Sequence, residues 1–197
     1  MDLTITDTEF DQISKLVYDQ SGIVLEAHKK TMLVSRLGKQ VRHLGLNRFE
    51  EYYQHVLADP GGEEMTLMLD LVSTNKTDFF REPKHFEFLR DEILPGLDTE
   101  KRIRVWSSAC SSGEEPYTIA ITILDAIKKP AQWDIKILAT DLSTRVLEKA
   151  AKGLYEESAI KGVPVDTVHR YFLGGRGDRS GKIKVKPHLP ELIKFRR

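Results

Sequence analysis

The sequence is poor in cysteine, in net charge and in long apolar runs. Its single cysteine, Cys110, excludes an internal disulfide framework and a cysteine-based zinc cluster, and the six histidines show no metal-ligand spacing. The 30 basic and 30 acidic residues cancel, so no overall field favours nucleic acid or an anionic membrane as a partner. No stretch approaches ~18 uninterrupted apolar residues, and the first dozen residues are acidic. We therefore expect a cytoplasmic protein without membrane insertion, metal or nucleic-acid partner.

The first 75 residues predict helices and show no strand pattern. Thr6 and Glu9 form a capping-box pattern ahead of a first helix, and a second helix with one apolar face is expected from about residue 27 to 44. Asn47 and Glu50 indicate the start of a third helix, and residues 63–73 form a fourth. These patterns predict a small all-α domain over residues 1–75.

Strand and helix patterns alternate after residue 100. A strand pattern at 102–106 precedes a helix pattern at 114–129, and a second strand at 134–141 precedes a helix capped by Ser143. "KIKVK" and "ELIKF" have the pattern of two more short strands. This alternation is typical of an α/β fold with a doubly wound parallel sheet. Residues 76–98, with a helix after Pro83, are expected to link the two parts.

Two acids stand in the segment "WSSACSSGEEPY", residues 106 to 117, directly after the first strand. Ligands of such sheets bind beyond the carboxyl ends of the strands, so Glu114, Glu115 and Asp141 are expected at one crevice. Asp141 is suited to accept hydrogen bonds from both hydroxyls of a ribose. Acids in place of a phosphate-binding turn favour a ligand with a cationic or amino group, such as S-adenosylmethionine. Alternatively, the two glutamates only stabilise the first turn of a helix.

Three motifs carry a resemblance to a known family. "NKTDFFREPKHF", "VWSSACSSGEEPYTIA" and "ILATDLSTRVLEKAAKGLY" occur in this order, and the chain resembles the chemotaxis receptor methyltransferase family (CheR) over nearly all its length. The resemblance implies a cytoplasmic enzyme that uses S-adenosylmethionine to methylate glutamate side chains of methyl-accepting chemotaxis receptors and releases S-adenosylhomocysteine. It also implies a receptor-docking helical domain (1–75), a segment with cofactor contacts (76–98), and the first part of a Rossmann-like, class I methyltransferase domain (99–197).

The resemblance also assigns roles to individual residues. The implied cofactor contacts are Asn75, Thr77, Arg81, Glu115 and Asp141. Without the resemblance, Asn75 and Thr77 are turn residues, and Arg81 is a surface ion-pair partner of Glu82 or Asp78. A glutamate substrate is ionised at neutral pH, with a reference pKa of about 4.3, so methyl transfer needs no general base. We expect Arg81 to act at the transfer site by orienting a carboxylate of the cofactor or the substrate.

Basic residues gather on the second helix. No acid occurs between Glu26 and Glu50, and Lys29, Arg36, Lys39 and Arg42 share one side of this helix. The resemblance implies that Arg36, Lys39 and Arg42 dock on acidic receptor helices. An ordinary solvated helix face remains the alternative.

Members of the family continue beyond the point that corresponds to Arg197 with further cofactor motifs. We therefore expect the Rossmann-like domain to be incomplete here, and the family's receptor-tail-binding β-subdomain to lie beyond the end. The first strand would then have one unpaired edge, which favours association and weak cofactor binding. A module that docks on receptors or senses a nucleoside without turnover remains the alternative. A nicotinamide-dependent oxidoreductase is disfavoured because the G-x-G-x-x-G turn is missing.

Overall fold

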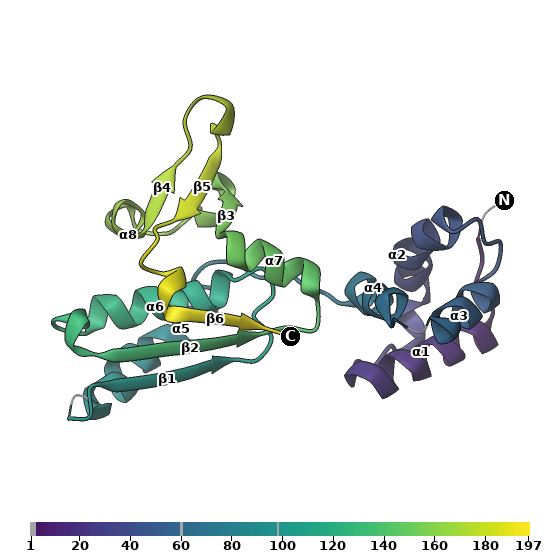
Figure 1. Ribbon diagram of the computed structural model, residues 1–197, viewed down its shortest axis with the longest axis horizontal. Helices are drawn as coiled ribbons and strands as arrows, with labels where there is room; N and C mark the ends of the chain where they lie inside the picture. The colour runs from purple at the N-terminus through teal and green to yellow at the C-terminus, as the bar shows by residue number, and fades with distance from the viewer. Residues whose placement is uncertain (1–2, 60, 98) are drawn as a thin grey trace. The chain divides into compact units, whose positions relative to one another are not determined.

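The chain divides into two units, Met1–Thr74 and Asn75–Arg197 (Figure 1). Each unit has its own hydrophobic core. The computed structural model describes residues 3–59, 61–97 and 99–197, so Asp98, the last residue of the expected linker segment, lies outside the described residues. The first unit is helical, and the second combines helices with a parallel sheet and a small antiparallel sheet. The predicted fold class, an all-α part followed by an α/β part, is confirmed.

The first unit is built from amphipathic helices. They are α1 (Asp7–Ser21), the 3-10 turn η1 (Ala27–Lys29), α2 (Lys30–His43), α3 (Phe49–Ala58) and α4 (Glu63–Val72). Each helix buries an apolar face in one shared core, to which Ile13, Leu37 and Phe49 contribute side chains without exposed area. Gly22 ends α1 in a left-handed conformation that glycine adopts without steric cost.

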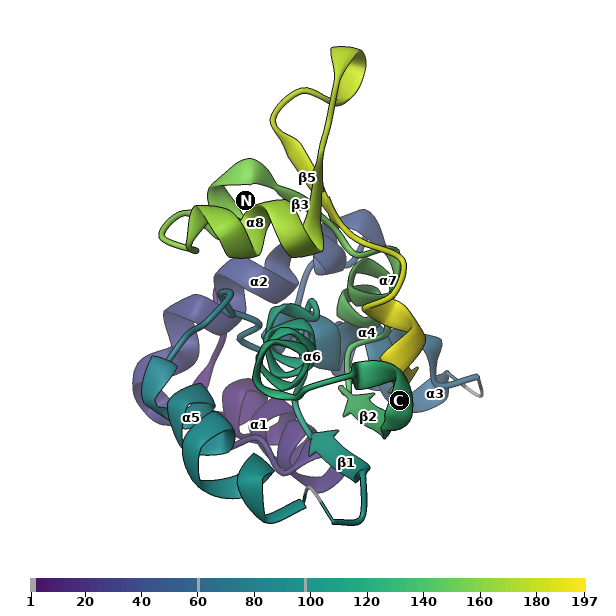
Figure 2. The same cartoon turned by 90° about the vertical axis from the view of Figure 1, so that its left-hand side faces the viewer.

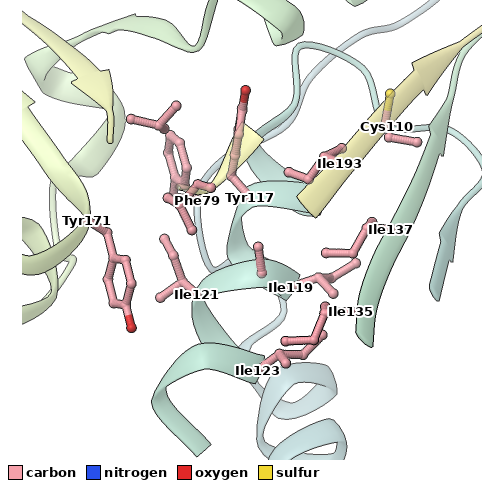
Figure 3. Packing of buried hydrophobic residues seen from close by; sticks show 14 of the residues in the cluster. Phe79, Cys110, Tyr117, Ile119, Ile121, Ile123, Ile135, Ile137, Tyr171 and Ile193 are labelled. Atoms are coloured by element: carbon pink, nitrogen blue, oxygen red, sulfur yellow. The ribbon is translucent and has the colours of Figure 1, made fainter. Parts of the chain in front are cut away.

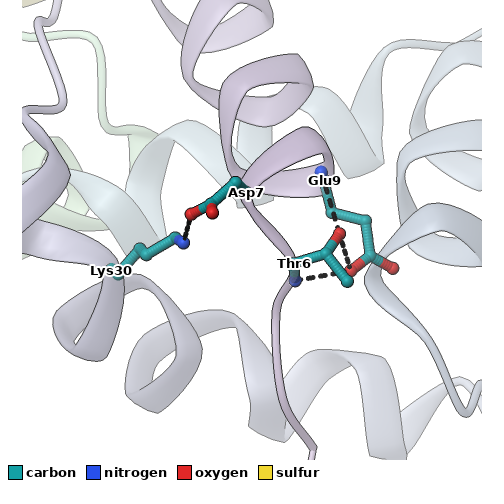
Figure 4. Close-up of polar contacts among 4 residues, drawn as sticks. All are labelled: Thr6, Asp7, Glu9 and Lys30. Carbon is teal, nitrogen blue, oxygen red and sulfur yellow. Dashed lines mark hydrogen bonds and ion pairs between the residues drawn. The ribbon is translucent and has the colours of Figure 1, made fainter.

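One buried carboxylate joins the starts of two helices. The N–H of Glu9 donates to Thr6 Oγ1 at 3.2 Å, and the N–H and hydroxyl of Thr6 both donate to Glu9 Oε2 at 2.8 Å (Figure 4). The predicted capping box is therefore confirmed. Glu9 Oε1 also accepts the N–H of Glu50 at 3.0 Å, at the start of α3. The predicted start signal at Asn47 was wrong, because Arg48 holds the N-cap position and α3 has no side-chain cap there.

Arg36 of α2 is a structural residue of the first unit. Its Nη1 donates to the carbonyl oxygens of Val72 at 2.7 Å and Ser73 at 2.8 Å, where α4 ends. The last carbonyls of a helix have no partner within the helix, so a guanidinium placed there supplies the missing donors. Arg36 thus fastens the end of α4 to α2.

The second unit begins with α5 (Pro83–Phe88), the π-helical turn η2 (Leu89–Ile93) and the 3-10 turn η3 (Leu94–Leu97). Its parallel sheet consists of β1 (Arg102–Ser107), β2 (Asp134–Thr140) and β6 (Ile193–Arg196), with β2 in the centre. Between them lie α6 (Glu114–Ala126), η4 (Pro130–Gln132), α7 (Thr144–Lys152) and η7 (Pro190–Leu192). In the register, Val105 pairs with Ile137, and Ile137 pairs with Ile193.

One face of the parallel sheet carries the core of the second unit. Figure 3 shows Ile119 and Ile123 of α6 beside Ile135, Ile137 and Ile193 of the strands. Side chains alternate along a strand, so the neighbouring positions point to the opposite face, where Trp106 is 66% exposed and Leu138 is 40% exposed. Within the described ranges, β1 has a strand neighbour only in β2, as the sequence predicted.

The small antiparallel sheet was not predicted. It contains β3 (Leu154–Glu156), β5 (Lys182–Val185) and β4 (Phe172–Gly174) in this order, with η5 (Glu157–Ile160), α8 (Val165–Tyr171) and η6 (Gly177–Arg179) between the strands. "ELIKF" forms β6 of the parallel sheet, whereas "KIKVK" forms β5 and pairs antiparallel to β3 and β4. In two views, β4, β5 and their loop extend away from the parallel sheet (Figure 2). The family's receptor-tail-binding β-subdomain was expected only beyond Arg197, whereas a small antiparallel sheet occurs within the chain.

The Glu9 carboxylate should make the first unit sensitive to acid. Burial raises the pKa of Glu9, but the hydrogen bonds from Thr6 and from the N–H of Glu50 outweigh burial and hold the pKa below 4.5, its usual value. A carboxyl with a lowered folded-state pKa stabilises the fold above its unfolded pKa, and this contribution is lost as the pH falls through the folded pKa. Glu9→Gln should therefore unfold at lower urea concentration than wild type at pH 7, with the difference shrinking below about pH 4.5. The exposed Asp11→Asn is the control, and a pH-independent difference would contradict the assignment.

Replacing Arg36 should destabilise the first unit alone. Arg36→Met keeps an unbranched apolar stem but removes the guanidinium and leaves two helix-end carbonyls without donors, which costs about 1 to 2 kcal/mol. Trp106 and Trp133 are the two tryptophans of the chain and both lie in the second unit. The urea midpoint should therefore fall when unfolding is followed by far-UV circular dichroism and stay unchanged by tryptophan fluorescence. Lys39→Met, at an exposed position of the same helix, should leave both midpoints in place.

Candidate functional site

The turn between β1 and α6 is tightly packed against neighbouring elements. Ser111 and Gly113 both adopt positive φ, 47° and 97°. A Cβ added at Gly113 would lie 2.8 Å from the Cβ of Ala150 and 2.9 Å from the hydroxyl of Tyr155, which is closer than van der Waals contact allows. The turn is therefore pressed against α7 and β3, and glycine is required where α6 begins.

Asp141 ties this turn to the end of β2. Its Oδ2 accepts the N–H of Ser111 at 2.8 Å, and its Oδ1 accepts the N–H of Ser143 at 3.0 Å. The turn after β1 and the residues after β2 thus meet at one edge of the sheet, as the strand order predicted. A carboxylate offers about four lone-pair positions, so each oxygen of Asp141 retains acceptor capacity for a ligand hydroxyl.

The two acids at the start of α6 have different surroundings. Glu115 is exposed, and its Oε1 accepts the hydroxyl of Ser107 at 2.6 Å. Glu114 is only 4% exposed, and its Oε2 accepts the hydroxyl of Ser112 at 2.7 Å. Burial raises the pKa of Glu114 above its usual value. Of the two carboxylates, Glu115 is therefore the one that a ligand can reach.

The segment 75–81 is fastened to the same turn and helix. The hydroxyl of Ser111 donates to the carbonyl oxygen of Asn75 at 3.0 Å. The buried ring of Phe79 makes edge contacts with Tyr155 and Phe172, at centroid distances of 5.1 and 5.2 Å. These contacts bring the backbone of Asn75 next to the turn that Asp141 holds, and Asn75 and Thr77 are both half-buried there.

Arg81 is exposed and folds back over its own segment. Its Nη1 donates to the carbonyl oxygen of Lys76 at 2.9 Å, which closes the loop 76–81. In the described ranges, no ion pair joins Arg81 to Asp78 or Glu82, the pairing that the sequence left open. The structure therefore brings Asn75, Glu115 and Asp141 to the turn after β1. Arg81 belongs to the same segment as Asn75, and among the described residues no hydrogen bond or ion pair joins it to Glu115 or Asp141.

The hydroxyl residues that bond to Glu115, Asn75 and Phe80 were not predicted from the sequence. Ser107 holds Glu115, Ser111 holds Asn75, and Thr118 accepts the N–H of Phe80 at 3.2 Å. Their only signal is the abundance of serine and threonine around the acids, which does not reveal which hydroxyl meets which partner. Cys110 is buried beside them, and burial, followed by the charge of Asp141, raises the pKa of its thiol to about 12. The thiol therefore stays protonated and unreactive at neutral pH.

The basic side chains of α2 belong to the first unit and differ in exposure. Lys39 and Arg42 are exposed, whereas Arg36 is half-buried and donates to the end of α4. Of the predicted docking residues, Lys39 and Arg42 are therefore accessible, and part of the charge of Arg36 is used within the fold.

No metal site or membrane span is found in the part of the chain that the structure describes. No three histidine, cysteine, aspartate or glutamate side chains of this part lie close enough together to bind a metal ion. None of its helices has the length and apolar character needed to cross a membrane.

Comparisons with known proteins agree with the architecture. The family model described as "CheR methyltransferase, SAM binding domain" matches residues 75–197, and the model described as "CheR methyltransferase, all-alpha domain" matches residues 8–73. The chemotaxis protein methyltransferase of Salmonella typhimurium is 38% identical over 194 residues, which are 98% of this chain and 66% of the relative. The corresponding protein of Escherichia coli is 37% identical with the same coverage.

A third relative, the chemotaxis protein methyltransferase of Borreliella burgdorferi, is 38% identical over 205 residues, covering 100% of this chain and 71% of the relative. The chain thus spans 66% of the length of the first two relatives. Both family models and all three relatives agree with the motifs that carried the resemblance. The chain belongs to the CheR methyltransferase family.

Proposed function

We propose that this chain serves the transfer of a methyl group from S-adenosylmethionine to glutamate side chains of chemotaxis receptors in the cytoplasm. The observation that carries the proposal is the convergence of Asp141, Glu115 and the segment 75–81 on the turn after β1, in a chain of the CheR family. The relatives are named chemotaxis protein methyltransferases, which supports methyl-accepting receptors as partners.

The residues of this turn fit the cofactor chemically. Asp141 keeps acceptor capacity for the two hydroxyls of a ribose, although both of its oxygens already accept backbone N–H groups. Glu115 is an exposed carboxylate held in place by Ser107, and it suits the amino group of the methionine moiety. Asn75 and Thr77 add polar side chains from the neighbouring segment. These acidic and polar side chains fit the uncharged ribose and the cationic methionine end of S-adenosylmethionine better than they would fit a pyrophosphate.

Methyl transfer to a glutamate requires the protein to align the reacting atoms and does not require it to transfer a proton. When bound, S-adenosylmethionine supplies a methyl group on a cationic sulfur, which an ionised glutamate of the receptor can attack without a general base. The task of the chain is to hold the acceptor oxygen in line with the methyl carbon and to exclude water. Arg81 is the proposed orienting cation, since its guanidinium is exposed and free of acidic partners among the described residues.

The helix α2 is the proposed docking surface for the receptor. Lys39 and Arg42 present positive charge on an exposed face, and acid-rich helices are complementary to such a face. Arg36 adds charge to the same region while it supports α4. Exposed charges of this kind act mainly on the rate of encounter and on specificity.

Receptor methylation tests the function directly. The protein that contains this chain is incubated with S-adenosylmethionine labelled in the methyl group and with membranes that carry chemoreceptors. Transfer of label to receptors as base-labile methyl esters is expected. Tight binding of S-adenosylhomocysteine together with no transfer would instead indicate a binding module without turnover.

The two ligand-facing acids should control cofactor affinity. Glu115→Gln and Asp141→Asn each remove a charged acceptor, and each should weaken S-adenosylhomocysteine binding by about tenfold, or ~1.4 kcal/mol, in calorimetry. The matched control is Asp134→Asn, which removes an acid paired with Arg104 at the opposite end of β2. Affinities that change equally in all three variants would show that only the total charge matters and would falsify the site assignment.

Charge reversal on α2 should impair receptor binding without affecting the cofactor. Lys39→Glu combined with Arg42→Glu should raise the KM for receptor, and the difference from wild type should shrink as salt rises, since charges beyond about 10 Å are screened at 0.1 M ionic strength. Arg36 is left unchanged because its loss would weaken the fold. Lys15→Glu combined with Lys128→Glu, two exposed positions outside α2, makes the same change in net charge and is the control. If the double variant keeps the wild-type KM and salt dependence, the basic face of α2 is an ordinary solvated helix face and does not dock the receptor.

A further inference from the structure

The segment with the proposed cofactor residues follows a strained backbone path. Phe80 and Glu82, on either side of Arg81, both have a φ of 55°. Large side chains rarely adopt this left-handed conformation, because the Cβ atom then approaches the following carbonyl oxygen. Such a conformation persists only where the surrounding contacts hold it in place. The contacts of Phe80 therefore decide the path of the backbone around Arg81.

Two kinds of contact hold Phe80. Its ring lies at a centroid distance of 6.1 Å from Phe86, tilted by 68°, and lines with Pro83 and Phe86 a groove of about 550 Å³. Its N–H donates to Thr118 Oγ1 at 3.2 Å, and within the described ranges no second acceptor receives it. The ring contact is apolar and non-directional, whereas the hydrogen bond constrains the orientation of the peptide group itself.

The surroundings of Thr118 fix its hydroxyl oxygen as a hydrogen-bond acceptor. It lies in α6, one turn after Glu114, with 0% of its area exposed. Its hydroxyl hydrogen is directed to the carbonyl oxygen of Glu114 at 2.7 Å, so its oxygen presents lone pairs to the N–H of Phe80. The same helix carries Glu115 in its first turn. The buried hydroxyl of Thr118 thus connects α6, which carries Glu115, with the segment 75–81, which carries three other proposed cofactor residues.

We propose that Thr118 is a positioning residue for cofactor binding: it accepts the N–H of Phe80, keeps this residue in the left-handed conformation, and thereby sets the path of the segment with Asn75, Thr77 and Arg81. The inference rests on the proposed function, because its consequence for the ligand assumes that these residues bind S-adenosylmethionine.

The chain offers a matched control one turn further along α6. Thr122 is also buried, at 8% exposure, and its hydroxyl donates to the carbonyl oxygen of Thr118 at 2.8 Å, the same contact within the helix that Thr118 makes with Glu114. Thr122 accepts no hydrogen bond from the segment 75–81 among the described residues. Valine at either position has nearly the shape of threonine and removes only the hydroxyl. The difference between Thr118→Val and Thr122→Val therefore isolates the bond to Phe80.

The test compares Thr118→Val, Thr118→Ser and Thr122→Val in two measurements. Amide hydrogen exchange by NMR reports the N–H of Phe80 without ligand, and calorimetry reports the dissociation constant of S-adenosylhomocysteine. Thr118→Val should exchange the Phe80 amide at least about tenfold faster and bind about fivefold to tenfold more weakly, whereas Thr118→Ser and Thr122→Val should resemble wild type. If the valine variant fails to fold, Thr118→Ala removes the same hydroxyl without adding bulk.

The outcomes separate the inference from the function on which it rests. Equal exchange rates and affinities in Thr118→Val and Thr122→Val overturn the positioning role. Faster exchange with unchanged affinity also overturns it, because the segment would then be held but irrelevant to the ligand. Wild-type protein that binds no S-adenosylhomocysteine contradicts the proposed function, while the exchange rates still decide whether Thr118 fixes the segment.

Discussion

The structure of the site depends on the carboxylate of Asp141, which accepts the backbone N–H groups of Ser111 and Ser143. Ser111 has a positive φ and is only 6% exposed, and a backbone N–H in such a buried residue requires a hydrogen-bond acceptor. The acid at the end of β2 provides it, and the turn after β1 is fixed as a result. A lysine in this turn would compete for that carboxylate.

Further contacts start from this turn and reach distant parts of the second unit. The hydroxyl of Ser111 donates to the carbonyl oxygen of Asn75. Gly113 has no side chain, so Ala150 and Tyr155 can approach its backbone closely. Tyr155 in turn contacts the ring of Phe79, four residues after Asn75. The segment before α5 is therefore bound to the turn at one end and to the core at the other. Asn75 and Asp141 are more than 60 positions apart in the sequence, and both form a hydrogen bond with Ser111.

Periodic patterns and the capping box of α1 could be predicted from the sequence, whereas the cap of α3 and the long-range polar contacts could not. The capping box of Thr6 and Glu9 spans three residues, so its pattern is visible in the sequence. The bond from Glu50 to the same Glu9 joins residues 41 positions apart and has no such signature. Likewise, "KIKVK" has a strand pattern, but alternation alone does not say which strands it joins. Glu115 and Asp141 were expected at one edge because strand order fixes where parallel strands end.

The adjacent acids Glu114 and Glu115 have opposite surroundings although they lie in the same helix turn. Neighbouring residues of a helix point about 100° apart, so two consecutive side chains cannot face the same surroundings. Glu114 turns toward Ser112 and the interior near Tyr155, where burial raises its pKa, and Glu115 turns toward Ser107 and solvent. The favourable interaction of acids with a helix N-terminus applies to both. Only the exposed carboxylate is accessible from solvent, so the alternative of purely structural acids describes Glu114, and Glu115 keeps its place in the proposed cofactor site.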